Sequence, residues 1–522
     1  MNWKSLVAAC WIGAGLAGAP PAFGDAAPQP APQQAPQPAA EQAPPPALSD
    51  TDQFINEIKH PLWWFTWGGD FRIRQEYIKN AHGLLNNTDD QVNMLRFRPR
   101  IWADVGPFFS DPNLGVPNGL DLYIRLADET RYFITRPTNL PWSVEPPYGT
   151  NPSFNEIVVD NLYVNWDRPD GLPVSFRVGR QDLTYGRGFV LLDGTPLDGS
   201  RSVYSDAAKL TIHDDSIRTD LDLFAVDNMA DESRLQPIAI EAGQEEFTSD
   251  FHTKILGAYM ISKYFAPLEL NAYYIYKDDT FANYGVIRQL FYGSDPMGRI
   301  VHTVGALGQG TVPQTGWDYY GEAAWQWGNQ GQIPGVSNEE NRQAYGLNSD
   351  LGYTFKQTPV TPRLHAAYMD LSGNDPHSGT YGGWDPVMSR WPQLSELFVY
   401  RWEGEGGGKT GIGSPGNWTN VQAFTLGGSA KPLPKMTTAF DYSLMLANEH
   451  TDGVNLVIPG GNATTGYGSG YVRGHLFVAK LLYDFNSHVS GHLWLEYFIP
   501  GDFYASNASN AIFFRWELMF KL

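Results

Sequence analysis

From residue 67 onward, the chain consists of segments of about ten residues in which apolar and polar positions alternate, with turn residues between them. In residues 514–522 the even-numbered positions are all apolar and the odd-numbered positions are mostly charged. Successive side chains of a strand point to opposite faces, so one face of each segment suits lipid and the other suits water. The pattern therefore predicts the strands of a transmembrane β-barrel.

About eighteen such segments can be recognised along the chain. They begin near residues 67, 93, 120, 156, 174, 202, 219, 252, 268, 300, 317, 343, 363, 420, 437, 472, 488 and 511. An even number of strands closes a bacterial barrel with both termini in the periplasm. A β-solenoid or propeller would also have many short strands, but it would show a fixed repeat period, and the chain has none.

The connections between the segments alternate in length. The short ones are 168–172, 213–216, 265–267, 356–361, 431–435 and 485–488, and the long ones are 132–155, 227–251, 278–298, 372–418 and 448–470. Outer-membrane barrels join their strands by short periplasmic turns and long external loops. We therefore expect an all-β fold, a transmembrane antiparallel β-barrel of about eighteen strands with periplasmic termini and long extracellular loops.

The chain before the first segment has a different character. Lys4 precedes an apolar stretch at 6–16, and small residues lie near a cleavage position after Gly24, as in a secretory signal peptide. We expect a signal peptide at 1–24, a Pro/Ala/Gln-rich periplasmic linker at 25–60 and the barrel at 61–522. The linker is interpreted either as a remnant of signal cleavage or as a contact for a periplasmic partner.

Composition agrees with a barrel in the cell outer membrane. Aromatic residues make up 14% of the chain, while the mean hydropathy is polar at −0.33. Aromatic girdles beside lipid headgroups, combined with a polar interior, produce this mixture. The formal net charge of −20 argues against a nucleic-acid partner, since phosphate binding needs a basic face. The only cysteine, Cys10, lies within the signal sequence.

Arginine is the strongest functional signal on the inward faces. By alternation, and with Arg180 close by, the inward arginines are Arg72, Arg74, Arg96, Arg98, Arg100, Arg125, Arg131 and Arg177. A lipid-facing arginine near the bilayer midplane would cost about 2–4 kcal/mol, so an inward position is expected. A guanidinium stays charged and binds carboxylates bidentately, which favours a path for anions.

The alternative is that these arginines only brace the wall. Acids expected on inward positions could pair with them, namely Glu76, Asp121, Glu129, Glu322, Glu496 and Glu517. Both interpretations can hold together, because a braced wall with surplus arginine still attracts anions.

Aromatic side chains on inward positions are the second clue. The phasing places Tyr123, Tyr163, Tyr320 and Trp494 in the lumen, either as surfaces for sugar faces or as packing for an in-folded loop. No nucleophile elbow, zinc helix or clustered set of metal ligands occurs in the sequence. We therefore expect no enzyme, no catalytic residue, no metal and no cofactor.

Two stretches carry a family resemblance. Residues 176–186, Phe-Arg-Val-Gly-Arg-Gln-Asp-Leu-Thr-Tyr-Gly, resemble a strand motif of the alginate export porins, and the resemblance covers most of 67–522. It implies an eighteen-stranded outer-membrane barrel whose arginine-lined lumen passes a polyuronate, with Arg177 and Arg180 in the lumen or at its rim. Residues 384–397 resemble a loop segment of the same group. Arg390 and Trp391 are its candidate constriction residues, in a loop that either folds into the pore or lies outside as a docking surface.

The sequence thus predicts an outer-membrane porin or export channel that passes anionic solutes by passive diffusion, with an acidic polysaccharide such as a polyuronate as a candidate. The expected substrate path is formed by the inward arginines, Arg180, Tyr123 and Trp494. Its expected partners are outer-membrane lipid and the solute. The alternative is a structural or adhesive barrel with a plugged pore, whose external loops bind a partner.

Overall fold

The computed structural model describes most of the chain from residue 50 to residue 522. The described residues are 50–81, 84–86, 91–108, 119–135, 153–192, 204–229, 234–235, 238–240, 251–281, 298–331, 340–375, 377–389, 394–398, 419–450, 457–458, 462–463 and 467–522. Within these ranges, no helix is long and apolar enough to cross a membrane.

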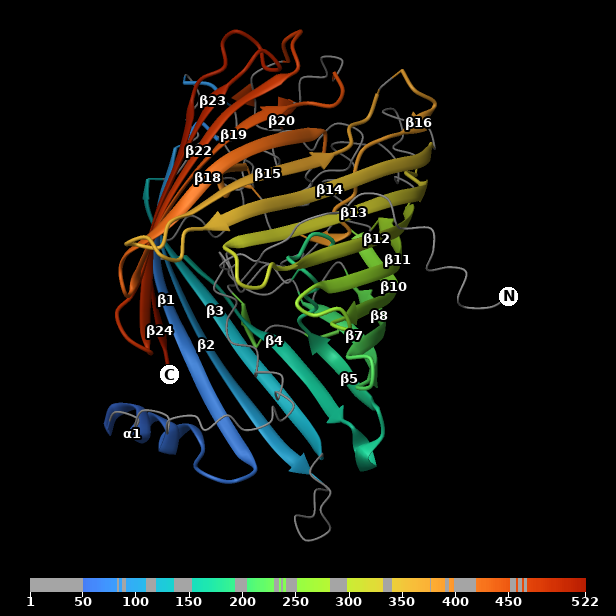
Figure 1. Ribbon diagram of the computed structural model, residues 1–522, viewed down its shortest axis with the longest axis vertical. Helices are drawn as coiled ribbons and strands as arrows, with labels where there is room; N and C mark the ends of the chain where they lie inside the picture. Colours follow the sequence, from blue (N-terminus) through green and yellow to red (C-terminus); the bar gives the residue numbers. More distant parts are fainter. Residues whose placement is uncertain are drawn as a thin grey trace.

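Eighteen antiparallel strands form one closed barrel, as the alternation predicted (Figure 1). Their bounds are β1 Phe65–Lys79, β2 Val92–Phe108, β3 Leu120–Thr135, β4 Ser153–Asp167, β5 Val174–Gln181, β7 Ser205–Asp214, β8 Thr219–Asn228, β10 Phe251–Ser262, β11 Glu269–Phe281, β12 Arg299–Thr311, β13 Trp317–Asn329, β14 Asn341–Thr354, β15 Arg363–Leu371, β18 Val421–Leu433, β19 Met436–Leu446, β22 Val472–Asp484, β23 Val489–Pro500 and β24 Ala511–Lys521. Each strand pairs with its neighbour along the chain, and β24 pairs with β1 from Asp70↔Lys521 to Lys79↔Ile512. A closed sheet has no free edge, which a lipid environment requires.

Six further strands of two residues each lie outside the barrel ring. They are β6 Leu191–Leu192, β9 Ala239–Ile240, β16 Thr380–Tyr381, β17 Met388–Ser389, β20 Val457–Ile458 and β21 Asn462–Ala463. β6 pairs with β17 in parallel, although almost two hundred residues separate them in the chain. Two long connections therefore meet.

One helix precedes the barrel, and the sequence analysis did not predict it. Helix α1, Asp50–Lys59, falls within the segment expected to be a linker. Trp67 Nε1 donates a hydrogen bond to the Ile58 carbonyl at 2.7 Å, and Asp52 lies 2.9 Å from His488 Nε2 in the turn between β22 and β23. Figure 1 shows α1 and the C-terminus at the same end of the barrel. The helix therefore follows the rim at the end where the short turns lie.

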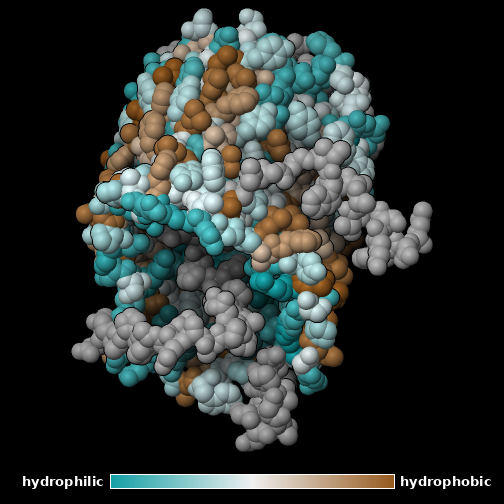
Figure 2. All heavy atoms as spheres, in the orientation of Figure 1, coloured by the Kyte–Doolittle hydropathy of each residue, from teal (hydrophilic) through white to brown (hydrophobic). Residues whose placement is uncertain are grey.

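The two faces of the barrel wall differ in polarity. Outward side chains such as Phe71, Ile101, Leu256 and Leu426 are 38–66% exposed. Figure 2 shows apolar side chains gathered on the outer surface and a hollow whose coloured wall is mainly hydrophilic. A barrel in a membrane needs this arrangement, because lipid contacts the outer face while the inner face is polar.

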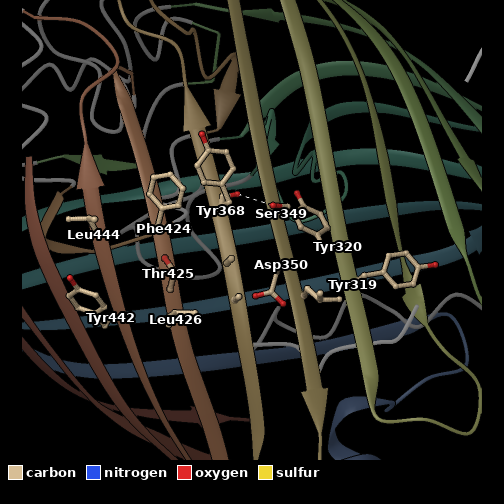
Figure 3. Close-up of a pocket in the computed structure, with 13 residues that line it drawn as sticks. Tyr319, Tyr320, Ser349, Asp350, Tyr368, Phe424, Thr425, Leu426, Tyr442 and Leu444 are labelled. Carbon is tan, nitrogen blue, oxygen red and sulfur yellow. Dashed lines mark hydrogen bonds between the residues drawn. The ribbon is translucent and has the colours of Figure 1, made fainter. Parts of the chain in front are cut away.

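An apolar groove of about 600 Å³ lies on the outward face between β13 and β19. Leu351, Phe424 and Leu426 contribute to its lining and are 44–66% exposed (Figure 3). At its centre Ser349 Oγ donates to the Tyr368 carbonyl at 3.2 Å. Since the large exposed side chains of the groove alternate with the inward ones, we assign it to the lipid-facing surface and not to the solute path.

A glycine in β12 makes room for an aromatic ring on the inner wall. Gly305 lies opposite Tyr273 of β11, and a Cβ atom at this position would overlap the Tyr273 ring. Tyr273 Oη donates to Glu322 at 2.9 Å. We expect Gly305→Val to lower the free energy of unfolding by about 1–3 kcal/mol, because the displaced ring loses this bond. The measurement is the urea midpoint of protein refolded into lipid vesicles.

The matched control is Gly308→Val in the same strand. A Cβ atom there would meet only Leu270 Cδ2, at 3.6 Å, so we expect a midpoint close to that of the parent protein. Equal midpoints for the two variants would show that the Tyr273 ring does not depend on Gly305.

Candidate functional site

The predicted inward arginines of β1 and β2 gather in one cluster on the wall. The arginine cluster consists of Arg72, Arg74, Arg96, Arg98, Arg100, Arg131 and Arg515. Strands β1, β2, β3 and β24 supply them at alternate positions, and Arg72, Arg74, Arg98 and Arg515 are at most 1% exposed. The sequence predicted six of the seven for the path, and Arg515 completes the cluster across the seam between β1 and β24.

Glu76 is the carboxylate at the centre of this cluster. Its Oε2 lies 2.8 Å from Arg96 Nη1, and its Oε1 lies 2.5 Å from Arg515 Nη2 and 3.4 Å from Arg74 Nε. The side chain of Glu76 is fully buried. One carboxylate therefore connects three strands, β1, β2 and β24.

Glu129 plays the same part on the other side. Its two carboxylate oxygens accept hydrogen bonds from Arg96 at 3.0 and 2.9 Å. One of them also accepts a hydrogen bond from Arg131 Nε at 2.7 Å, and Arg72 lies 3.6 Å away. A bidentate contact of this kind fixes the orientation of the guanidinium plane. Glu129 thereby joins β3 to β1 and β2.

Two further acids of the wall pair with arginines of the cluster. Asp70 lies 3.3 Å from Arg98 Nη2 and 2.7 Å from Arg100 Nη2. Glu517 lies 3.8 Å from Arg72 Nε. The bracing role considered from the sequence is therefore present.

The cluster nevertheless carries more positive than negative charge. Among the described residues, its seven arginines form ion pairs with five carboxylates, of which Asp70, Glu76, Glu129 and Glu517 belong to the wall and Glu396 to the connection between β15 and β18. Buried charges are screened much less than exposed ones. The described residues of the cluster therefore have a positive net formal charge.

Three predicted arginines lie outside the cluster. Arg125 binds Asp160 at 2.6 Å and Asp182 at 3.0 Å. Arg177 lies with its guanidinium carbon 4.5 Å from the centre of the Tyr163 ring. Both are on the inner face, as expected.

Arg180 differs from the other predicted lumen residues. It lies three positions beyond Arg177 in β5, so strand alternation places it on the opposite face. It pairs with Asp206 at 2.9 Å and stacks at 3.6 Å on the Tyr204 ring. We therefore assign Arg180 to the extracellular rim, the second of the two positions that the resemblance implied, and not to the substrate path.

The predicted lumenal aromatics form two groups. Tyr123 is stacked between Trp102, at 6.1 Å, and Tyr163, at 4.9 Å, so that an aromatic row runs across β2, β3 and β4. Trp494 donates to Glu496 at 2.7 Å, and Lys480 Nζ lies 3.5 Å from its ring centre. The row is partly exposed and offers flat apolar faces.

Tyr320 instead packs in the interior. It is 3% exposed and donates to Glu322 at 2.7 Å, and Arg187 covers its ring at 4.1 Å. Arg187 belongs to the connection between β5 and β7. For this residue the packing alternative of the sequence analysis describes the structure.

The feature that the sequence analysis left undecided is the path of the connection between β15 and β18. Its described residues are 372–375, 377–389, 394–398 and 419–420. The first three of these ranges, here called the inward loop, contact inward side chains on two sides of the barrel. One contact is with β11, the ninth strand of the ring, and the other is with β23 and β24, which close it. The inward loop therefore crosses the lumen.

The first anchor of the inward loop is Asp385. Lys277 Nζ lies 3.0 Å from its Oδ1, and Arg299 Nε lies 3.5 Å from its Oδ2. Burial alone would raise the pKa of Asp385, but Lys277, Arg299 and Arg342 together hold it below its ordinary value. The carboxylate therefore stays charged in the docked loop.

The second anchor is Glu496 of β23. Its carboxylate accepts hydrogen bonds from the Glu396 and Leu397 backbone nitrogens, both at 2.9 Å, and from the Ser395 hydroxyl. Glu396 in turn lies 3.2 Å from Arg515 of the arginine cluster. Three donors on one carboxylate hold this turn of the loop firmly against the wall.

Between the anchors the inward loop meets the connection between β5 and β7. Leu191–Leu192 and Met388–Ser389 pair as two short parallel strands. Phe189 stacks on Trp384 at 5.3 Å. Both segments bury apolar side chains in a common core inside the barrel, which stabilises their inward position.

Arg390 and Trp391, the predicted constriction residues, lie outside the described residues. The loop that contains them folds into the barrel on both sides of this gap. Within the described ranges, no group of three or more His, Cys, Asp or Glu side chains is placed to hold a metal ion.

Comparison with solved structures finds similar barrels. OccK9 (OpdG) of Pseudomonas aeruginosa has a TM-score of 0.51 at 9% identity, and OccAB2 of Acinetobacter baumannii has a TM-score of 0.50 at 11% identity. OpdL of Pseudomonas aeruginosa has a TM-score of 0.50 at 10% identity. Each comparison covers 87% of this chain and 98% of the other. At these identities the likeness shows the fold alone.

Comparison of sequences identifies the family. No curated protein matches the chain. The family described as alginate export matches residues 63–516, which is nearly the whole barrel. The chain is therefore an outer-membrane β-barrel, and it belongs to the alginate export family.

Proposed function

We propose that this barrel is an outer-membrane channel, and not an enzyme, through which anionic solutes pass by passive diffusion. The substrate class is acidic polysaccharide, such as a polyuronate. The observation that carries the proposal is the arginine cluster, in which six buried arginines and the half-buried Arg131 face four wall carboxylates. A positive net charge lowers the free energy of an anion in the lumen.

The arrangement of the arginines in rows along two strands favours movement of an anionic solute over its tight retention. Its arginines extend along β1 and β2 at every second residue, from Arg72 to Arg74 and from Arg96 to Arg100. A row of weak sites lets a solute move from one to the next, whereas a single tight site would retain it. The aromatic row of Trp102 and Tyr123 supports a sugar backbone, whose apolar faces can lie against the rings.

Ion selectivity tests the proposal directly. We expect the purified channel in planar bilayers under a salt gradient to give reversal potentials of an anion-selective pore, and acidic oligosaccharides to block its current. The triple variant Arg96→Gln, Arg98→Gln, Arg100→Gln should reduce the anion preference, because it removes three of the seven positive charges. Because Asp70 loses both of its ion-pair partners, Arg98 and Arg100, in this variant, its folding is verified first by electrophoretic mobility.

The matched control is Arg168→Gln. This arginine lies in the turn after β4 and pairs with Asp215 at 2.6 Å, away from the lumen. Its removal should leave the reversal potential unchanged. Cation preference of the parent channel, or failure of acidic oligosaccharides to block it, would refute the proposal.

A second candidate follows from the inward loop. A barrel whose lumen is crossed by a loop anchored on both walls can also be a plugged structural or adhesive protein, with external loops that bind a partner. The two candidates differ in conductance once the loop is removed, which is considered in the Discussion.

For the region before the barrel, we propose a signal peptide at 1–24 and a periplasmic linker at 25–60. The contacts of α1 support the second assignment, because Asp52 binds Ser487 at 3.0 Å and His488 at 2.9 Å in the turn between β22 and β23. These bonds would hold the end of the linker at the rim. A periplasmic partner of the linker is part of this proposal.

A further inference from the structure

The inward loop carries a carboxylate into a cationic site that the barrel wall forms by itself. We propose that Lys277, Arg299 and Arg342 are a carboxylate-binding site of the solute path, and that Asp385 occupies it as an internal substitute for a carboxylate of the solute. The inference rests on the proposed function and adds to it how the channel responds to its substrate. An acidic solute would release the loop by competing with Asp385.

The geometry of the site is that of carboxylate recognition. Lys277 Nζ lies 3.0 Å from one Asp385 oxygen, and Arg299 Nε lies 3.5 Å from the other. The two cations come from the adjacent strands β11 and β12, and their side chains are 5% and 9% exposed. Strand pairing therefore fixes the spacing of the cations independently of the loop.

At this site the positive charges of the wall outnumber its negative charges. Asp279 is the wall acid at this site, 3.0 Å from Lys277 and 2.6 Å from Arg299. Arg342 adds a third positive charge, since it donates to the carbonyl of Gly383, two residues before Asp385. Among the described residues, the site without Asp385 would hold three cations and one acid in a buried place, so another carboxylate is strongly favoured there.

Neutral hydrogen-bonding groups surround the cations. Gln326 of β13 forms two hydrogen bonds with the Asp385 backbone. Its Oε1 accepts one from the Asp385 nitrogen at 2.9 Å, and its Nε2 donates one to the Asp385 carbonyl at 2.6 Å. Arg342 donates to the Gly383 carbonyl. When the loop leaves, the Gln326 amide and the guanidinium can bond hydroxyl groups. Cations for a carboxylate beside groups for hydroxyls match the chemistry of a uronate unit.

The same loop repeats this arrangement on the opposite wall. Glu396 lies 3.2 Å from Arg515 of the arginine cluster. Asp385 and Glu396 are eleven positions apart in the loop and bind cations on walls half a ring apart. A polymer with many carboxylates can compete at both places, whereas a neutral polymer can compete at neither.

The experiment uses a thiol reporter in the full-length protein. The only native cysteine is Cys10, so Ser389→Cys gives one reactive thiol in the described barrel, at a position that is 3% exposed in the docked loop. Reaction with a methanethiosulfonate reagent measures undocking in lipid vesicles. We expect oligogalacturonate to accelerate the reaction by about tenfold, in a saturable manner. Malto-oligosaccharide of equal length, which is neutral, should leave the reaction rate unchanged.

The variant Asp385→Asn in the reporter background should react about tenfold faster without any sugar, and oligogalacturonate should add nothing. The control Asp375→Asn neutralises another acid of the same loop. The Asp375 carboxylate accepts a hydrogen bond from the backbone nitrogen of His377, two residues further along the loop. It should behave like the parent. Heat-modifiable mobility in electrophoresis verifies that each variant is folded.

The inference is overturned if Asp385→Asn reacts as slowly as the parent, or if malto-oligosaccharide or potassium chloride of equal ionic strength accelerates the reaction as oligogalacturonate does. The proposed function fails separately. A channel with anion-selective reversal potentials and an unresponsive loop refutes only this inference, whereas a cation-selective channel refutes the proposed function whatever the loop does.

Discussion

Replacing Glu76 with Gln is expected to lower the free energy of unfolding by about 3–5 kcal/mol, the cost of breaking a buried ion pair by removing one partner. Glu76 is fully buried and lies within ion-pair distance of Arg74, Arg96 and Arg515. Glutamine has nearly the same shape, so packing changes little. The loss comes from leaving three buried guanidinium groups with less negative charge.

The urea midpoint of protein refolded into lipid vesicles measures this effect, followed by tryptophan fluorescence and by electrophoretic mobility. Glu57→Gln in α1 is the matched control, since Glu57 is exposed and outside the barrel wall. Its midpoint should equal that of the parent. A Glu76→Gln protein that unfolds at the parent's midpoint would show that the arginine cluster does not need this carboxylate.

Removing residues 372–418 is expected to raise the single-channel conductance several-fold. Leu371 and Val421 are paired at the ends of β15 and β18, so a short turn can join the two strands without changing the register of the barrel. The deletion takes away both Asp385 and Glu396, and with them the segment that crosses the lumen. Ion flow increases because the path becomes wider.

A shorter deletion of residues 399–418 is the control. It removes loop length but keeps the described inward loop, so a conductance close to that of the parent would assign the increase to the inward loop. A protein that inserts normally and remains closed after loss of 372–418 would contradict the channel proposal. It would favour the structural or adhesive barrel.

Alternation along the chain predicted the barrel because one face of each strand contacts lipid and the other faces the polar interior. In β1, Phe71 and Ile73 face outward while Arg72 and Arg74 face inward, and this is visible in the sequence without any tertiary contact. The expected starting positions of the strands agree with the observed bounds to within a few residues. The inward position of the arginines followed from the same rule.

Alternation could not predict the course of the long connections. Residues 384–397 were singled out by resemblance, yet Asp385 and Glu396 were not named among the candidates. Their role depends on cations more than a hundred residues away, Lys277 and Arg515, and no periodicity in the loop points to them. Sequence signals for Arg299 and Arg515 did exist, since both occupy inward strand positions.

The acids of the lumen illustrate a related limit. Glu76, Glu129 and Glu517 pair with arginines, as the bracing interpretation expected. Glu496 instead receives the inward loop, and Glu322 accepts hydrogen bonds from tyrosines. Phasing places a carboxylate on the inner face, but its partner depends on which strands and loops lie beside it.

The seam between β1 and β24 has a consequence for how the molecule assembles. Glu76 and Arg515, which bind across it, are 439 residues apart in the chain. Until the last strand docks on the first, Glu76 lacks one of its cations and both strands have an open edge. Contacts of such long range are slow to form. We therefore expect ring closure to be a late step of folding, and entry of this face into the bilayer to depend on it.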